Sequence, residues 1–403
     1  MNEINVMCPN LSHRTERRSA VEAQFADKPE FRLSVVPAMV HPMRGAWGLW
    51  QTFLSIVKQQ REAGAPYFVF CEDDHTFTAD YHYPYLALAI DKAEAMEADL
   101  LLGGVSWFRD AIQTDEHLYW TDRFNGMQFT VVFRRFYDRI ISLCTDEGYV
   151  TDIQLSNISD RIFVMYPFIS VQREFGYSDV TLSNNQAGYV EGLFKHTAFT
   201  FQLMDKVRLA YGERLAAVKA LSAGHVKENI RMARMVFVPD NEKAKRWQQL
   251  ADFIRKVYDE GEDDAIVVGK DEALIDAAMN DARFIQAATK AAMLGSHVLF
   301  GGAGWVGHVV SVEDELWWTD GVRNWQVAVV FRLAFDKILS APDEGGDVEI
   351  GLNDLLANKL LFHPFKSERT EGQAATQRME KCRIIKNAYP YLCNNHLYDH
   401  EED

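Results

Sequence analysis

Three adjacent carboxylates follow an apolar segment of this sequence. The segment YFVFCEDDHTF, residues 67–77, places Glu72, Asp73 and Asp74 directly after a run that favours a buried strand. Adjacent like charges repel each other, and burying one of them without a partner is costly. Because side chains alternate along a strand, we expect Glu72 and Asp74 to point to one side and Asp73 to the other. The carboxylates therefore either form a solvated acidic turn or hold a positive group.

A divalent cation is the positive group that this pattern favours. Carboxylate oxygens suit Mg²⁺ or Mn²⁺, which keep several waters and share protein carboxylates with substrate phosphates. Glu72 and Asp74 are the predicted metal ligands, and Asp73 is expected to accept hydrogen bonds from a ribose or a base. We expect His75 to be a hydrogen-bonding neighbour rather than a ligand. The sequence contains neither GxGxxG nor GxxxxGK[ST], so dinucleotide binding and P-loop ATP chemistry are not indicated.

The elements before the carboxylates predict how they are positioned. Residues 4–9, 31–40 and 67–70 have the composition of buried strands, and helical periodicity separates them at 15–26 and 47–64. This alternation predicts an α/β fold with a mainly parallel sheet and flanking helices. In such sheets, ligands bind beyond the carboxyl ends of the strands. The acidic residues lie at such an end.

Part of this pattern returns further along the chain. Residues 101–142 and 299–340 are identical at 16 of 42 positions, at an offset of 198 and without a gap. The same offset aligns YFVFCEDD with AIVVGKDE (265–272), so that Lys270 replaces Glu72. The segment EFGYSD becomes EGQAAT in the second copy. We therefore predict a duplicated domain whose second copy is degenerate.

The length of the chain also indicates two domains, because single cores stop growing at roughly 250–300 residues and this chain has 403. We expect a catalytic domain at 1–230, closed by helices at about 190–230. The degenerate repeat and a C-terminal tail are expected at 231–403. Gly103 and Gly104 recur in the second copy, which indicates a requirement of the backbone rather than a catalytic role.

Composition narrows the classes of function. The net charge of −16 argues against nucleic-acid binding through a broad basic face. The five cysteines are widely spaced and include no CxxC pair, which favours a reduced, cytoplasmic protein without a zinc site. We expect no signal peptide and no membrane-spanning segment. Peripheral contact with the inner face of a membrane stays open, as does homo-oligomerisation.

Five segments form an ordered set between residue 4 and about residue 182: INVMCPNLSHRTERR, CEDDHTFTADY, NGMQFTVVFRRFYDRII, TDIQL and YPFISVQREFGYSDVT. Together they resemble the family-25 glycosyltransferases, the lipopolysaccharide-type β-galactosyltransferases. The first is similar to that family's opening strand and Asn-Leu-x-x-Arg-x-x-Arg-Arg stretch, and the second to its Glu-Asp-Asp segment. Two departures leave the exact sugar donor open. Met7-Cys8-Pro9 stands where the family prefers an aliphatic run, and the family needs no second copy.

The resemblance implies a nucleotide-diphospho-sugar transferase fold of the GT-A type. It also implies a metal-dependent glycosyltransferase that uses Mn²⁺ or Mg²⁺ and inverts the anomeric centre. The donor would be a UDP-sugar with a galactose-type hexose. The acceptor would be a glycan or a lipid-linked glycan, in the synthesis of surface polysaccharide such as lipopolysaccharide.

Inverting transfer requires one general base for the acceptor hydroxyl. Asp152 stands at the family's Asp-x-x-Leu position and is the first candidate, with a helix N-cap as the alternative role. Glu174 and Asp179 are the next candidates. Arg14 and Arg17 are expected either to contact the nucleotide phosphates or to be solvated arginines in the first turn of a helix.

Asn10 and Trp107 complete the predicted donor-binding set. Asn10 opens the Asn-Leu stretch, and Trp107 could stack on a base or a sugar. Trp305 is its counterpart in the second copy, so core packing is an equal alternative for both. Two other functions compete. A sugar-nucleotide nucleotidyltransferase usually carries a glycine-rich basic loop, which is absent from the N-terminal sequence. A non-catalytic scaffold that binds a glycan or a partner agrees with Lys270.

Overall fold

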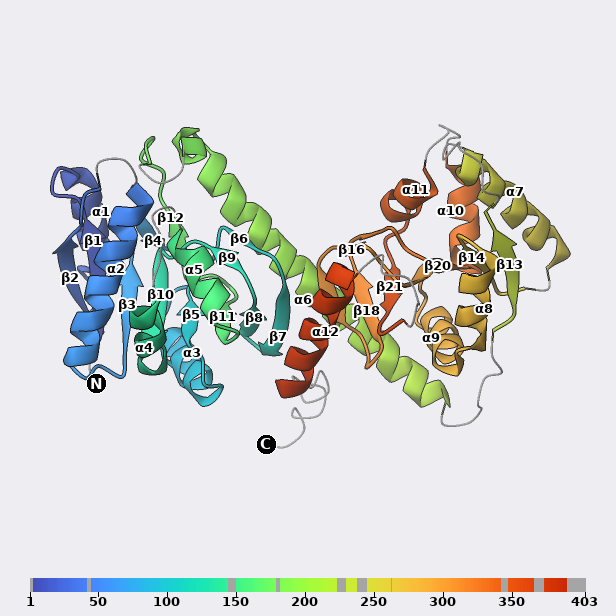
Figure 1. Cartoon of the computed structure of the whole chain (residues 1–403), viewed down its shortest axis with the longest axis horizontal. Helices are drawn as coiled ribbons and strands as arrows, with labels where there is room; N and C mark the ends of the chain where they lie inside the picture. Colours follow the sequence, from blue (N-terminus) through green and yellow to red (C-terminus); the bar gives the residue numbers. More distant parts are fainter. Residues whose placement is uncertain are drawn as a thin grey trace. The chain divides into compact units, whose positions relative to one another are not determined.

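The chain divides into two compact units. The computed structural model describes residues 3–41, 45–143, 150–178, 182–222, 230–237, 245–261, 263–341, 347–365 and 373–389. Unit 1 comprises Met1–Leu203 with Tyr389–Tyr391, and unit 2 comprises Met204–Ala388 with Leu392–Asp403 (Figure 1). The division lies inside the long helix α6 (Tyr189–Ser222), whereas the predicted boundary near 230 lies beyond the end of that helix. Among the described residues, no helix is long and apolar enough to cross a membrane.

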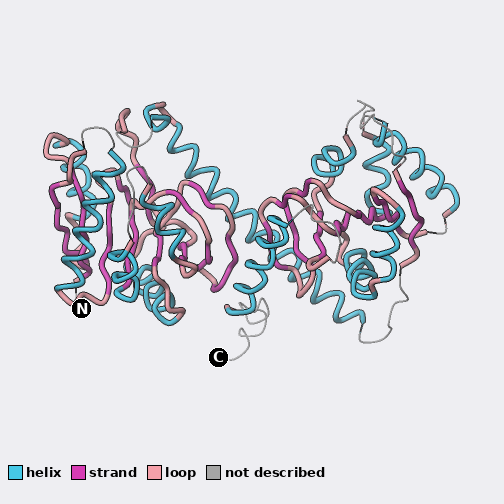
Figure 2. Tube along the Cα trace, viewed as in Figure 1, coloured by secondary structure: helices cyan, strands magenta, loops and turns pink. Residues whose placement is uncertain are grey.

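Unit 1 is built on an eight-stranded mixed sheet with the order β2-β1-β3-β10-β5-β11-β8-β7 (Figure 2). Its strands are β1 (Ile4–Asn10), β2 (Phe31–Pro37), β3 (Tyr67–Cys71), β5 (Leu100–Leu102), β7 (Ala111–Asp115), β8 (Leu118–Thr121), β10 (Phe129–Phe133) and β11 (Ile162–Met165). β1 runs parallel to β2 and β3, and β5 runs parallel to β11. β10 and β8 run antiparallel to their neighbours. The prediction of a mainly parallel sheet is wrong at these pairings, because short strands rather than crossover helices precede β10.

The helices of unit 1 cover this sheet. They are α1 (Thr15–Phe25), α2 (Gly45–Glu62), α3 (Tyr83–Ala95), α4 (Arg134–Ser142) and α5 (Thr151–Ile158), followed by the 3₁₀ helix η1 (Leu182–Asn185) and α6. The apolar spacing along α2 buries Trp50, Phe53 and Val57 on one face. Phe53 packs edge-on against Phe70 of β3, with ring centroids 5.0 Å apart. This packing fixes β3, whose carboxyl end carries the acidic residues.

Unit 1 also contains two short two-stranded ribbons that are separate from this sheet. One pairs β4 (His75–Phe77) with β12 (Ser170–Gln172), and the other pairs β6 (Trp107–Phe108) with β9 (Phe124–Asn125). A Cβ atom on Gly104 would lie 2.2 Å from the carbonyl oxygen of Ser170. A glycine is therefore required at this close approach of two backbones, as expected for a position that recurs in both copies.

Unit 2 has a seven-stranded sheet with the order β13-β14-β20-β15-β21-β18-β17. Its strands are β13 (Met232–Val236), β14 (Ala265–Gly269), β15 (Val298–Gly301), β17 (Val309–Ser311), β18 (Leu316–Thr319), β20 (Val327–Phe331) and β21 (Lys359–Phe362), with a separate ribbon of β16 (Trp305–Val306) and β19 (Val322–Arg323). Strand order and pairing directions match those of the series β1-β3-β10-β5-β11-β8-β7 in unit 1. Among the described residues of unit 2, no strand corresponds to β2. Its helices are α7 (Lys245–Glu260), α8 (Glu272–Asn280), α9 (Ala282–Met293), η2 (Arg332–Ala334), α10 (Phe335–Ser340), α11 (Val348–Leu355) and α12 (Gln373–Ala388).

Candidate active site

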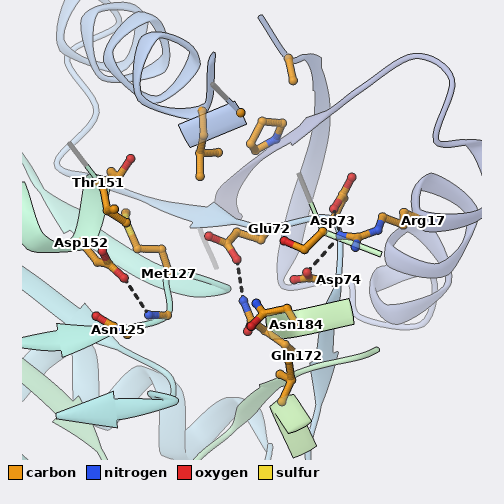
Figure 3. A pocket seen from close by; sticks show the side chains of 18 of the residues that line it. Arg17, Glu72, Asp73, Asp74, Asn125, Met127, Thr151, Asp152, Gln172 and Asn184 are labelled. Carbon is orange, nitrogen blue, oxygen red and sulfur yellow. Dashed lines mark hydrogen bonds and ion pairs between the residues drawn. The ribbon is translucent and has the colours of Figure 1, made fainter. Parts of the chain in front are cut away.

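A cavity of about 650 Å³ opens in unit 1 at the carboxyl ends of β1 and β3. Its walls come from elements far apart in the sequence: the turn after β3, the loop between β9 and β10, the start of α5, β12, and the start of α6. Figure 3 shows side chains from several of these elements converging on one space. Among the lining residues, four carboxylates face two arginines, so acidic groups outnumber basic ones: Glu72, Asp73, Asp74 and Asp152, with Arg14 and Arg17.

Arg17 holds the acidic turn in place. Its Nη1 lies 2.9 Å from Asp73 Oδ1 and 3.0 Å from Asp74 Oδ2. Its Nη2 donates to the carbonyl oxygen of Tyr177 at 2.7 Å. The interpretation of Arg17 as a solvated helix residue is therefore wrong, because its side chain is only 6% exposed. It lies on the buried face of α1 with Val21 and Phe25.

The expected alternation of the three carboxylates is also wrong for Asp73. Because β3 ends at Cys71 and a turn follows, the two-residue period of a strand no longer applies. Asp73 and Asp74 therefore share Arg17 (Figure 3). Asp73 Oδ2 also accepts a hydrogen bond from Asn10 Nδ2 at 2.9 Å. Asp73 is thus held by groups of this protein from both sides.

Glu72 and Asp74 are the two carboxyls of the turn whose pKa values are raised. Glu72 Oε2 accepts from Gln172 Nε2 at 2.8 Å. Burial, with repulsion from Asp74, raises the pKa of Glu72 well above its ordinary value. Burial also raises the pKa of Asp74 to about 6, although Arg17 opposes this shift. Oδ1 of Asp74 is buried and has no hydrogen-bond partner among the described residues.

These residues fit a divalent cation. The described residues contain no group of three or more His, Cys, Asp and Glu side chains already arranged around a metal position. Two partly buried carboxyls with raised pKa values, one with an oxygen that has no partner among the described residues, nevertheless offer hard oxygen ligands that a divalent cation would hold in the ionised form. Two protein carboxylates are the usual share for Mg²⁺ or Mn²⁺ when phosphates and waters complete the shell.

His75 serves as a neighbour of this turn. Its Nδ1 shares a hydrogen bond with Ser170 Oγ at 2.7 Å. Burial lowers the pKa of His75 to about 3, so the imidazole is neutral. The side chain is packed among Phe25, Phe77 and Phe129. This is the hydrogen-bonding role that the sequence predicts.

Asp152 reaches the cavity from the first turn of α5. The N-cap of this helix is Val150, so the predicted N-cap alternative for Asp152 is wrong. Its Oδ2 accepts from the backbone amide of Gly126 at 3.1 Å, and Oδ1 accepts from that of Ile153 at 2.8 Å. Burial raises the pKa of Asp152, against these backbone hydrogen bonds. A carboxylate with a raised pKa is a stronger base near neutral pH.

The structure does not bring every predicted residue to the cavity. Asn10 lies behind Asp73 and is not part of the lining, and Trp107 is also outside it. The Glu174 carboxylate instead accepts hydrogen bonds from the amides of Gly188 and Glu191 at the start of α6, which lower its pKa. Asp179 lies outside the described residues.

Other cavity residues were not predicted as site residues. Gln172 orients Glu72, and Asn125, Gly126 and Met127 form the wall beside Asp152 (Figure 3). The sequence signals that could have found them are the glutamine of the YPFISVQREF segment and the NGM that opens the segment NGMQFTVVFRRFYDRII. Neither residue type implies chemistry unless its neighbours in space are known.

In unit 2, the charged side chains at the equivalent positions interact with other groups of the protein. Lys270 stands where unit 1 has Glu72, and its Nζ lies 3.6 Å from Glu349 Oε1. Glu349 Oε2 accepts from the amide of Asn324 at 3.1 Å, as Asp152 does from Gly126. Asp271 is the N-cap of α8 and accepts from the amide of Leu274 at 2.9 Å. The second acidic segment is therefore used for an ion pair and a helix cap.

Comparison with known proteins gives only distant likenesses. No protein-family model matches the chain, and no curated protein matches it. A structure of UDP-glucose pyrophosphorylase complexed with UDP-glucose is similar with 10% identity and a TM-score of 0.30, over 50% of this chain and 99% of that one. A glycosyltransferase involved in the glycosylation of the major capsid of PBCV-1 is similar with 12% identity and a TM-score of 0.28, over 40% of this chain and 81% of that one. Function must therefore be argued from the site itself.

Arg17→Met tests whether this guanidinium supports the acidic turn. Removing one partner of a buried ion pair costs about 3–5 kcal/mol, because the other charge stays buried without compensation. The matched control is Arg18→Met on the same helix, since Arg18 is exposed and, among the described residues, its ion-pair partner is Glu22 at 2.9 Å. That change should stay within about 1 kcal/mol. Urea unfolding of both variants measures the difference, and equally small effects would contradict this role of Arg17.

Proposed function

We propose that unit 1 is a metal-dependent glycosyltransferase related to family 25. It would move a galactose-type hexose from a UDP-sugar to a hydroxyl of a glycan or lipid-linked glycan, with inversion, in the synthesis of surface polysaccharide. The observation that carries this proposal is the pair of partly buried carboxylates, Glu72 and Asp74, at one wall of the cavity. A volume of about 650 Å³ lies within the range of small-ligand sites.

Donor binding is assigned to the acidic turn and the arginine beside it. Glu72 and Asp74 would hold Mn²⁺ or Mg²⁺. Such a cation, when bound, stabilises the negative charge that develops on a diphosphate leaving group. Arg14 lines the same wall and presents a guanidinium suited to phosphate oxygens. Asp73 and Asn10 are assigned a supporting role in the turn, because Asn10 donates a hydrogen bond to Asp73.

Asp152 is the proposed general base. It lines the cavity on the wall formed by α5 and the loop before β10. Burial raises its pKa, and the amides of Gly126 and Ile153 fix the orientation of its carboxylate. In this position it would take the proton from the acceptor hydroxyl as that oxygen attacks the anomeric carbon. Glu174 is a weaker candidate, because amide hydrogen bonds lower its pKa.

Unit 2 is proposed to be a degenerate duplicate that performs no transfer. The Lys270 ammonium occupies the position of a ligand carboxylate and already neutralises Glu349. A divalent cation would therefore meet repulsion from Lys270 at this position. The core strands on both sides of the change persist, as expected for a fold that is kept after its site has been lost.

Asp74→Asn tests the donor site. The variant keeps the shape of the side chain but removes the charge and one hard oxygen ligand. We expect Mn²⁺-dependent UDP binding, measured by calorimetry with Mn²⁺ and with EDTA, to weaken at least about tenfold, the lower range for damage around a metal site. Asp80→Asn is the control, since Asp80 is exposed in the same segment. Unchanged UDP affinity in Asp74→Asn would overturn the metal assignment.

Asp152→Asn tests the base. Asparagine keeps an oxygen that can accept from Gly126, so the loop stays anchored, but it cannot take a proton. Transfer should fall by roughly 10²–10⁴-fold, the usual contribution of general-base catalysis. UDP-sugar affinity should stay unchanged. Transfer rates with UDP-galactose, UDP-glucose and UDP-N-acetylhexosamines provide the measurement, and near-normal turnover of the variant would exclude Asp152 as the base.

A further inference from the structure

Two tryptophans at equivalent positions of the repeat are exposed. Trp107 begins β6 and Trp305 begins β16, at the offset of 198 that relates the two copies. Their exposed fractions are 45% and 46%. The alternative of core packing is therefore wrong for both, and neither indole is explained by the packing of the sheet.

In unit 1 the indole lies on the outer face of the ribbon of β6 and β9. Phe108 and Phe124 pair on the face that is buried, while Trp107 is paired with the exposed Asn125. Asn125 and Ser106, the residue before Trp107, both line the cavity. The ribbon therefore presents a flat apolar ring and an amide at the edge of the candidate active site.

Unit 2 repeats this arrangement with a different polar group. Val306 and Val322 pair on the buried face, and Trp305 is paired with Arg323. The guanidinium of Arg323 lies over the indole, 5.1 Å from its ring centroid. An aromatic ring beside a hydrogen-bonding side chain is thus present on the exposed face of both ribbons.

The two copies diverged around this common feature. The carboxylate at position 72 became Lys270, and the polar partner changed from Asn125 to Arg323. A single exposed apolar side chain needs no explanation. The same indole kept exposed in both units, after metal-binding features were lost from one of them, indicates a requirement that is separate from the donor site.

We propose that Trp107 and Trp305 are stacking platforms for pyranose rings of an oligosaccharide. One face of a pyranose exposes C–H groups and its rim carries hydroxyls, so a flat indole beside hydrogen-bonding groups is complementary to it. The Asn125 amide both donates and accepts, and the Arg323 guanidinium donates. At Trp107 the bound sugar is the acceptor, an assignment that rests on the proposed function. At Trp305 the sugar is bound without chemistry.

A panel of immobilised oligosaccharides tests this proposal on the full chain. The panel carries galactosyl-, glucosyl- and N-acetylhexosaminyl-terminated chains of two to six sugars. The glycans that bind the unchanged chain are then titrated against Trp107→Ala, Trp305→Ala and the double variant. Phe199→Ala in unit 1 and Leu333→Ala in unit 2 are the controls, because both side chains are 60% exposed and lie outside the ribbons.

We expect each tryptophan variant to weaken glycan binding at its own unit about tenfold, equivalent to about 1.4 kcal/mol, and the double variant to weaken it at both units. The controls should bind as the unchanged chain does. No bound glycan on the panel, or binding that survives both tryptophan substitutions, would overturn the proposal. Mn²⁺-dependent UDP binding, measured in parallel, should be unaltered in all variants. If UDP binding fails in the unchanged chain while tryptophan-dependent glycan binding persists, only the proposed transfer reaction is rejected.

Discussion

The buried guanidinium of Arg17 is the interaction on which the site depends. Without it, Asp73 and Asp74 could not both be ionised beside the end of an apolar strand. One cation does not balance the whole turn, however. Among the described residues, no basic side chain pairs with Glu72 and no hydrogen bond reaches Asp74 Oδ1, and burial raises the pKa values of both carboxyls. The fold thus presents carboxylate oxygens to the cavity, which are the ligands that a hard divalent cation prefers.

Unit 2 meets the same electrostatic constraint in another way. In unit 2, Lys270 stands at the position of the Glu72 carboxylate, and its ammonium forms an ion pair with Glu349. Both units keep a hydrogen bond between an acidic side chain and the neighbouring loop. The Gly126 amide donates to Asp152 in unit 1, and the Asn324 amide donates to Glu349 in unit 2. Anchoring this loop is therefore a structural task that Asp152 performs in addition to its proposed chemistry. In the described part of unit 2, Lys270 thus stands in place of the Glu72 carboxylate that lines the cavity of unit 1.

The sequence predicted the elements that local pattern determines. The strand at 67–70 and the helix at 47–64 appear as β3 and α2, because their apolar spacing matches their buried faces. The direction of β10 was missed, since strand pairing across the sheet leaves no local signal. The orientation of Asp73 was wrong because a turn replaces the strand after Cys71. Gln172 comes from a segment 100 residues beyond its partner Glu72, and only the folded chain shows that they meet.

The position of bound metal tests the central claim most directly. Crystals of the full chain grown with Mn²⁺ and UDP would show it as an anomalous difference peak. We expect one peak per chain, between the Glu72 and Asp74 carboxylates, and no peak beside Lys270 and Asp271. UDP bound in the cavity without a metal peak at Glu72 and Asp74, or a peak in unit 2, would contradict it.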